Sequence, residues 1–403
     1  MKNGKKNTNE LSEQSSLNIY NFQRNNNLIK IDQKKSNNKL ILCLYIITFL
    51  SICLILYIIY LLINLRNIKE NCKSIVYNSD KHLNNIDKNN DIIKPYIKSQ
   101  KDFCEHPNRY KNQEYENQIN LFDVKFNELR YQIYAFKSIN VMSLALKNYG
   151  YFEKLVSNNI IAALRFYAIK NNILNNKDIY MLDIGGNIGW YPSLLGRYGY
   201  SILSFEAFER NHYVEKKNLC HLYNNSNIII ITKGLGDKEK ICHYFNHINN
   251  EGNGMVICDD KKFLYNTKLK KMFVKESEVE ITTLNQFIPY LSNKNIALMK
   301  IDVEGQELKI LEGGAKLITQ YHVPFVVLEF SPTYLKEVGS EPIKLIQLFI
   351  DNGYKISIEG FLTNKYLTAD ELLAKTGFQI NCYFIHQSIV KKIMNLFNNF
   401  IIL

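Results

Sequence analysis

Residues 179–190, Ile-Tyr-Met-Leu-Asp-Ile-Gly-Gly-Asn-Ile-Gly-Trp, decide the fold of this chain. A short apolar run ends in Asp183, and a glycine-rich turn then opens a stretch of helical pattern. This order of strand, turn and helix is typical of a nucleotide-type cofactor site. Glycine suits the turn because a side chain would hold the backbone away from a ligand. A second apolar run, 200–205, leads to Glu206, where an acid is placed to accept hydrogen bonds from ribose hydroxyls.

The turn is spaced as D-x-G-x-N-x-G, formed by Asp183, Gly185, Asn187 and Gly189. It differs from the G-x-G-x-x-G that seats a pyrophosphate on a helix N-terminus. An acid at the end of the strand would repel a pyrophosphate and suits a ligand with a positive charge. S-adenosylmethionine has a cationic sulfonium, an ammonium group and a ribose, and it lacks a phosphate. The spacing therefore favours S-adenosylmethionine as the cofactor, with an ordinary β-turn-α connection as the alternative interpretation.

A stretch without charged residues, 40–65, lies near the start of the 403-residue chain. As a helix it would span roughly 39 Å at ~1.5 Å per residue, against a bilayer core of roughly 30 Å. A cleaved signal peptide has a shorter apolar region nearer the terminus, so we expect one transmembrane helix here. The preceding residues carry eight lysines or arginines and three acids. This balance favours a type II anchor in the secretory pathway, in the Golgi or the ER.

The rest of the chain divides by composition into three parts. Residues 1–39 are polar and predict a disordered basic tail. Residues 66–115 continue that composition and predict a stem, and 116–403 are expected to form the catalytic domain. Over about 120–175 apolar residues recur at helical spacing, which predicts a helical lead-in to the first strand.

From residue 179 onward, short β-type runs alternate with helical stretches. This alternation indicates an α/β domain with a parallel, doubly wound (Rossmann-like) sheet. Two late runs are expected to form a closing pair, and the last residues an amphipathic helix that covers the sheet. The expected strands are 179–184, 200–205, 227–232, 296–301, 324–330, 354–358 and 382–386, and the helix is 389–403.

Charge and cysteine content exclude two classes of function. The net charge is +12, but the lysines are scattered and no arginine stripe with interleaved aromatics appears, so we expect no nucleic-acid partner. The chain has eight cysteines and no C-x-x-C pair, which argues against a structural zinc site. Six cysteines lie outside residues 40–65, and an even number permits disulfides without requiring them.

Carboxylates follow several of the expected strands, where ligands of open α/β sheets bind. We expect Asp183 to hold the cationic amino-acid end of the cofactor, directly or through water, and Glu206 to hold its ribose. Asp237 is placed either to accept from an adenine amine or to serve as a turn acid after Gly236. The full set is Asp183, Glu206, Asp237, Asp302, Glu304 and Glu329.

Asp302 and Glu304 are the candidate catalytic residues. They lie two apart, so in an extended chain their side chains point the same way. In the first interpretation no metal is bound, and one of the two acts as general base toward a hydroxyl. In the second, both bind a divalent cation. Glu304 and Glu307 are also placed to cap a helix that begins near Gly305. For Glu329, a structural hydrogen-bonding role is an equal alternative.

Taken together, the motifs resemble those of the FkbM-type methyltransferases over about 145–388. The resemblance implies a seven-stranded sheet whose last strand is antiparallel, S-adenosylmethionine as methyl donor, and O-methylation of a small-molecule, sugar or polyketide hydroxyl. Gly186 stands where the family often has alanine, a departure we expect to be harmless. Proline is common in the family near 209–211 and is absent here. The matching segments are 182–189, 205–208, 235–237, 283–284, 300–307, 328–332 and 352–354.

The sequence therefore predicts a membrane-anchored methyltransferase that uses S-adenosylmethionine and O-methylates a glycan or small molecule. Its cofactor-binding candidates are the turn residues Asp183, Gly185, Asn187 and Gly189, together with Glu206 and Asp237. The alternative is a type II glycosyltransferase that uses a nucleotide sugar and a metal bound at Asp302 and Glu304. The layout of anchor, stem and catalytic domain fits both enzymes.

Overall fold

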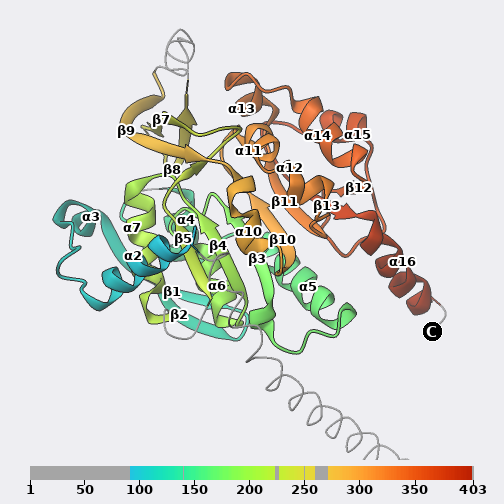
Figure 1. Cartoon of the computed structure of the whole chain (residues 1–403), viewed down its shortest axis with the longest axis horizontal. Helices are drawn as coiled ribbons and strands as arrows, with labels where there is room; N and C mark the ends of the chain where they lie inside the picture. The colour runs from blue at the N-terminus through green and yellow to red at the C-terminus, as the bar shows by residue number, and fades with distance from the viewer. Residues whose placement is uncertain (1–90, 139, 223–226, 249, 259–270, 402–403) are drawn as a thin grey trace, which may run out of the picture. The chain divides into compact units, whose positions relative to one another are not determined.

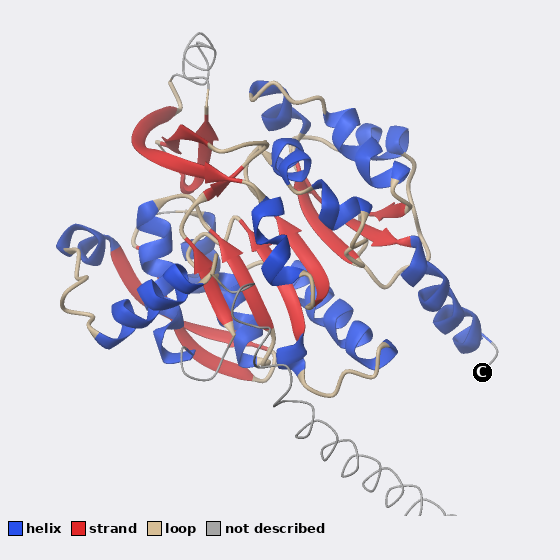
Figure 2. Ribbon diagram, in the orientation of Figure 1, coloured by secondary structure: helices blue, strands red, loops and turns tan. Residues whose placement is uncertain are grey.

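A seven-stranded sheet forms the centre of the folded domain, with helices on both sides (Figure 2). Its strands are β3 (Ile179–Ile184), β4 (Ser201–Phe205), β5 (Ile228–Ile231), β10 (Asn295–Ile301), β11 (Phe325–Phe330), β12 (Tyr354–Ser357) and β13 (Ile380–His386). The spatial order is β12-β13-β11-β10-β3-β4-β5, and β13 runs antiparallel to both neighbours while the other pairings are parallel. All seven expected runs are strands, and the mostly parallel α/β sheet with an antiparallel last strand is confirmed.

Helices cover both faces of this sheet (Figure 1). Neighbouring side chains of a strand point to opposite faces, so Ile179 and Met181 of β3 pack on one side and Tyr180 and Leu182 on the other. All of β3 is buried, as expected for the centre of a parallel sheet. The first side is covered by α5 (Lys154–Lys170), α6 (Trp190–Arg197), α7 (Glu209–Leu219) and α16 (Gln387–Ile401). The second is covered by α10 (Ile288–Leu291), α11 (Glu307–Gly313), α12 (Ala315–Thr319), α13 (Pro332–Glu337), α14 (Pro342–Asp351) and α15 (Ala369–Lys375).

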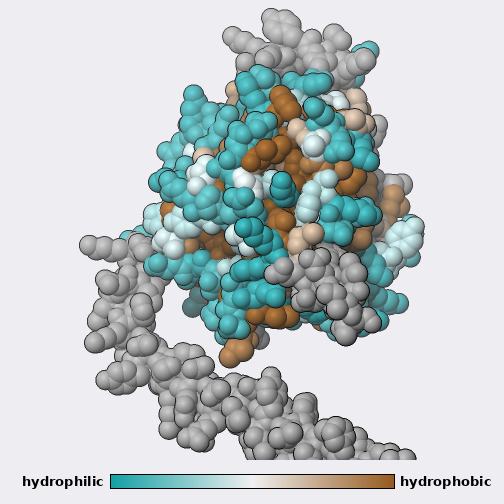
Figure 3. All heavy atoms as spheres, turned by 90° about the vertical axis from the view of Figure 1, so that its right-hand side faces the viewer, coloured by the Kyte–Doolittle hydropathy of each residue, from teal (hydrophilic) through white to brown (hydrophobic). Residues whose placement is uncertain are grey.

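The computed structural model describes residues 91–138, 140–222, 227–248, 250–258 and 271–401. The tail expected over 1–39 and the transmembrane helix expected over 40–65 lie outside these residues. Within the described part of the chain, no helix has the length and apolar character needed to span a bilayer. The face that carries α14, α15 and α16 shows hydrophilic residues around a band of apolar ones (Figure 3).

The expected helical lead-in is correct only in its second half. Helices α4 (Val141–Tyr149) and α5 do precede the sheet, but residues 119–136 form a hairpin of β1 (Ile119–Phe126) and β2 (Leu129–Phe136). Buried Val124 and Phe126 alternate with exposed neighbours, which is the period of a strand and was mistaken for a helical one. Asn127, at φ +49°, makes the turn between them in a conformation that asparagine tolerates.

The described part of the expected stem is folded onto the domain. Residues in the range 66–115 form α2 (Lys94–Glu105), and α3 (Gln113–Gln118) follows it. A disulfide joins Cys104 of α2 to Cys220, and the ring of Phe103 meets that of Tyr213 edge-on with centroids 5.4 Å apart. The second half of the predicted stem therefore belongs to the catalytic domain, because apolar residues and a disulfide bind it there.

A second, four-stranded sheet is inserted between β5 and β10, where none of the expected strands lies. It contains β6 (Gly234–Leu235), β7 (Lys240–His247), β8 (Asn250–Ile257) and β9 (Phe273–Thr282), in the order β6-β9-β7-β8. A disulfide between Cys242 and Cys258 joins β7 to the residue after β8. Phe208, which precedes α7, stacks on Tyr244 with centroids 3.9 Å apart, so this sheet is packed against the central domain.

Candidate functional site

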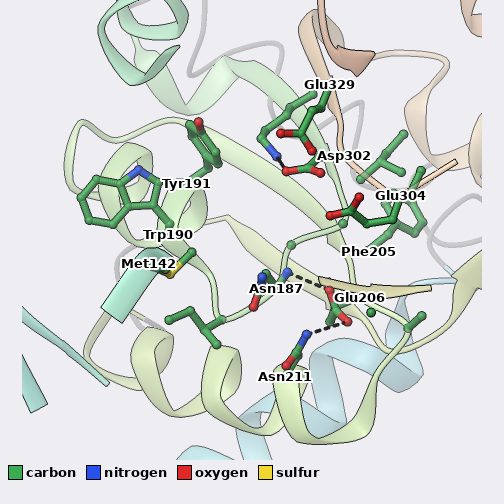
Figure 4. A pocket seen from close by; sticks show the side chains of 18 of the residues that line it. Met142, Asn187, Trp190, Tyr191, Phe205, Glu206, Asn211, Asp302, Glu304 and Glu329 are labelled. Carbon is green, nitrogen blue, oxygen red and sulfur yellow. Dashed lines mark hydrogen bonds and ion pairs between the residues drawn. The ribbon is translucent and has the colours of Figure 1, made fainter. Parts of the chain in front are cut away.

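A cavity of about 490 Å³ opens at the carboxyl ends of β3, β4 and β10. Two groups of residues line it, and Figure 4 shows Asn187 and Glu206 of the first and Asp302, Glu304 and Glu329 of the second. We call the first the glycine side; it consists of Gly185, Asn187 and Glu206. We call the second the acid side; it consists of Lys300, Asp302, Glu304 and Glu329. Both groups line the cavity.

The glycine turn is fixed by the strands on either side of it. The backbone N–H groups of Gly185 and Gly186 both donate to the carbonyl oxygen of Phe205, at 2.9 Å each. Gly185 has φ +86°, and a Cβ there would lie 1.9 Å from the carbonyl oxygen of Asp302. Only glycine fits this position, because both the left-handed backbone and the neighbouring strand exclude a side chain. The turn thereby brings bare backbone to the cavity.

The carboxyl group of Glu206 accepts three hydrogen bonds, from the glycine turn and from residues that follow Glu206 in the chain. Its Oε2 accepts from the backbone N–H of Asn187 at 2.7 Å. Its Oε1 accepts from the N–H of Phe208 at 2.9 Å and from Nδ2 of Asn211 at 3.4 Å. Burial raises the pKa of Glu206, and the backbone N–H groups of Phe208 and Asn187 oppose that rise. The carboxyl group is thus oriented at the cavity wall with lone pairs left for a hydroxyl donor.

Asp183 lies beneath the cavity instead of in its wall. It is completely buried, and neither carboxyl oxygen has a hydrogen-bond partner among the described residues. It is not among the residues that line the cavity, so the structure gives it no direct contact with a ligand there. Burial raises the pKa of Asp183 to about 7, against the opposing charge of Lys300.

The acid side brings three carboxyl groups together. Oxygens of Asp302, Glu304 and Glu329 lie within 4.8 Å of one another, a set of ligands that a hard divalent cation accepts. Burial raises the pKa of Glu329 to about 11, together with the charge of Asp302 and a hydrogen bond to it. Burial also acts to raise the pKa of Asp302, but Lys300 and that hydrogen bond bring it below its ordinary value. Lys300 therefore favours the ionised form of Asp302, whereas burial and the neighbouring charge favour the protonated form of Glu329.

Glu304 adopts a conformation that few side chains take. Its φ is +51°, in the left-handed region, and its Oε2 is buried without a partner among the described residues. The capping role that the sequence offered to both acids belongs to Glu307, whose Oε1 accepts from the N–H of Gly305 at 3.0 Å. A strained backbone that turns an unpaired carboxyl toward a cavity is a feature of functional sites.

Lys300 is a site residue that the sequence reasoning missed. Its side chain is 6% exposed, and its Nζ lies 2.8 Å from Oδ2 of Asp302. The β3–β10 register also places it beside Asp183. Burial acts to lower its pKa, but Asp302, Asp183 and Glu153 outweigh that effect and raise it. The available signal was a lysine within the otherwise apolar run of β10, since a buried lysine needs an acid partner.

Glu153 and Tyr191 complete the surroundings of Lys300 and were also missed. The Tyr191 hydroxyl donates to Oε2 of Glu153 at 2.6 Å, and the ammonium of Lys300 lies 5.0 Å from the centre of the Tyr191 ring. Both residues line the cavity. No sequence signal marked Glu153, because it is the N-cap residue of α5, well before the glycine turn.

Asp237 and Gly189, two of the expected cofactor-binding residues, do not line the cavity. Asp237 does not line the cavity and pairs with Lys240 at 2.6 Å on a turn, so the structure does not bring it to the other site residues. Gly189 is the N-cap of α6, at φ +81°, and supports the turn from outside the cavity.

Residues 183–356 match the family model described as the methyltransferase FkbM domain. The match confirms the resemblance and, with it, S-adenosylmethionine as the cofactor. "Methyltransferase 1" of Beauveria bassiana (strain ARSEF 2860) is 29% identical over 146 residues, which cover 34% of this chain. The match spans 58% of that relative's length.

Solved structures also resemble the chain at low sequence identity. The METTL16 MTase domain is 11% identical with a TM-score of 0.34, over 71% of this chain and 92% of that one. Magnesium protoporphyrin IX methyltransferase (ChlM) from Synechocystis PCC 6803 with bound SAM is 11% identical with a TM-score of 0.29, over 57% and 79%. At such scores the fold assignment rests on the strand order alone.

Proposed function

We propose, from the premise that residues 183–356 form a methyltransferase FkbM domain, that the chain O-methylates a hydroxyl of a glycan or small molecule. The observation that supports this most is the position of Asp302. Its side chain lies in the cavity wall with Oδ2 2.8 Å from Nζ of Lys300, and its backbone is next in space to the glycine turn. A carboxylate so placed can accept the proton of a hydroxyl.

The site fits S-adenosylmethionine. Gly185 allows a ligand to approach bare backbone, and Glu206 presents an oriented carboxyl group for the ribose hydroxyls. The cavity of about 490 Å³ is in the ordinary range for a site of this kind, roughly 300–1,000 Å³. Asp183 lies beneath it, so any contribution of this residue to cofactor binding is electrostatic or passes through water.

When bound, the cofactor would supply an electrophilic methyl group, whose bond to the sulfonium sulfur would break as its bond to the acceptor oxygen forms, leaving a neutral thioether. Asp302 accepts the proton of the acceptor hydroxyl, and Lys300 keeps Asp302 ionised and oriented. Glu329 is hydrogen-bonded to Asp302, so the charge is spread over a pair of carboxyl groups. Glu206 and the glycine turn position the donor, and positioning supplies much of the acceleration of such a transfer.

The glycosyltransferase alternative has less support. A nucleotide sugar would bring a pyrophosphate, yet the cavity wall carries Glu206, Asp302 and Glu304. The carboxyl cluster on the acid side does offer cation ligands, but Lys300 already compensates the charge of Asp302. The family match is to a methyltransferase domain.

Transfer of a labelled methyl group tests the proposed reaction. The full chain, purified in detergent, is incubated with tritium-labelled S-adenosylmethionine and with glycan and small-molecule fractions extracted from cells. We expect label in a product that is stable to base, as an ether is and an ester is not. Label only in base-labile or amine products would contradict O-methylation of a hydroxyl.

We also propose that residues 40–65 anchor the chain in a membrane, with the catalytic domain in the lumen of the secretory pathway. Two disulfides, Cys104–Cys220 and Cys242–Cys258, support this orientation, because disulfides persist in oxidising compartments and are rare in the cytosol. Protease protection on sealed vesicles tests it. A protected catalytic domain is the expected result, and digestion without detergent would contradict a lumenal domain.

A further inference from the structure

A row of buried polar side chains runs beneath the glycine turn and continues into helix α7. The strand register places Ser204 of β4 beside Asp183 of β3, and Asp183 beside Lys300 of β10. Ser204 is completely buried, and its hydroxyl donates to Oε1 of Glu215 at 2.6 Å. Glu215 comes from α7, is also completely buried, and does not line the cavity. It is therefore placed below the turn and out of reach of a bound ligand.

Both partners of this pair touch the turn. A Cβ at Gly186 would lie 2.2 Å from the Ser204 hydroxyl oxygen and 2.9 Å from Oε1 of Glu215. A Cβ at Gly189 would lie 2.8 Å from Cγ of Glu215. The backbone at Gly186 is outside the left-handed region, so its conformation alone would admit alanine. The space for a Cβ at Gly186 is instead closed by Ser204 and Glu215, so glycine fits this position and alanine would require these side chains to shift.

We propose that the Ser204–Glu215 pair is a support that fixes the glycine turn in its cofactor-binding conformation, with Glu215 as a positioning residue. The proposal rests on the proposed binding of S-adenosylmethionine. Helix α7 holds the turn at a second point, since Nδ2 of Asn218 donates to the carbonyl oxygen of Ile188 at 2.8 Å. Glu206 holds it at a third, through the N–H of Asn187. The turn is thus fixed along its length by side chains that follow β4.

The surroundings of Glu215 disfavour an ionised carboxylate. Burial raises the pKa of Glu215 well above its ordinary value, and the nearby charges of Asp183 and Glu206 add to the rise, against the hydrogen bond from Ser204. An ionised carboxylate with a single hydrogen bond in this place would be costly. The role therefore depends on the shape of the side chain and on its hydrogen bond to Ser204, and glutamine keeps both.

Isothermal titration of the full chain with S-adenosylmethionine tests the support. We expect Glu215→Ala to weaken binding about tenfold and Glu215→Gln to bind close to the wild type. Glu209→Ala, an exposed acid on the same helix, is the matched control and should change nothing. Thermal unfolding of each variant shows whether it is folded at the titration temperature.

Gly186→Ala provides a second route that leaves Glu215 in place. We expect it to weaken binding, because the new methyl group displaces the Ser204 hydroxyl, and we expect Gly186→Ala/Ser204→Ala to bind more tightly than Gly186→Ala alone. Folded Glu215→Ala with wild-type affinity, or Gly186→Ala with wild-type affinity, would overturn the support and leave the proposed function standing. A wild-type chain that does not bind the cofactor would overturn both.

Discussion

On the glycine side of the cavity, Glu206 is held by backbone N–H groups, whereas on the acid side Asp302 is held by the ammonium of Lys300. Backbone donors keep their place whatever a neighbouring side chain becomes. The acid side instead depends on one buried cation among several carboxyl groups. A single substitution should therefore weaken the glycine side locally, and on the acid side it should disturb charge balance, stability and catalysis together.

Asp302→Asn should produce the largest effect, because it removes the proposed base while keeping the side-chain shape. We expect methyl transfer to fall about 10²–10⁴-fold, the usual contribution of a general base, with cofactor affinity nearly unchanged. Initial rates with labelled cofactor and titration of the same sample measure the two quantities. A variant that keeps its transfer rate would remove Asp302 from the chemistry.

Lys300→Met tests the charge balance of the acid side. The change leaves Asp302 and Asp183 without their cation, and breaking a buried pair costs about 3–5 kcal/mol of unfolding free energy. Urea unfolding measures this loss. Lys344→Met is the control, since Lys344 pairs with Glu341 at 2.6 Å with both side chains more than half exposed and such a pair contributes about 0–1 kcal/mol. Equal losses of unfolding free energy in the two variants would contradict a larger contribution from the buried pair.

Glu206→Ala should have a smaller and purely local effect. We expect cofactor affinity to fall at least about tenfold, or roughly 1.4 kcal/mol, because the ribose loses its acceptor. The unfolding free energy should change less than in Lys300→Met. The Glu206 substitution leaves only neutral N–H groups without a partner, whereas the Lys300 substitution leaves a buried charge without one. If Glu206→Ala were the more destabilising of the two, the contrast between the sides would be reversed.

Asp183→Asn should give the smallest effect, seen in the pH dependence of stability. The pKa of Asp183 is about 7 in the folded chain, above its ordinary value. Its protonated form is therefore favoured by folding, and the resulting stability is lost as pH rises toward and through 7. We expect the unfolding free energy of Asp183→Asn to fall less than that of the wild type between pH 5 and about 8. Parallel curves would contradict a raised pKa.

The sequence predicted the glycine side better than the acid side for a physical reason. Gly185, Asn187 and Glu206 form a local pattern, because a strand, a turn and the next strand suffice to build that side. Lys300 lies on β10 and Glu153 is the N-cap residue of α5, and only the folded chain brings these two elements together. Asp237 fell outside the site because the inserted sheet, unmarked in the sequence, directs it toward Lys240.

The same reason explains the errors in the fold. The strands of the central sheet are short apolar runs that end in acids or glycines, and they were found. The hairpin of β1 and β2 was read as helix, because its few buried residues fit both periods. The folded half of the expected stem is polar in composition, and its attachment through the disulfide Cys104–Cys220 depends on a partner 116 residues away.

Titration of the full chain with S-adenosylmethionine, beside a UDP-sugar, is the most direct test of the central claim that this cavity holds a methyl donor. We predict saturable binding of S-adenosylmethionine at one site, weakened at least about tenfold in Glu206→Ala, and no comparable binding of the UDP-sugar. A folded chain that does not bind S-adenosylmethionine, or that binds the UDP-sugar more tightly, would contradict the account.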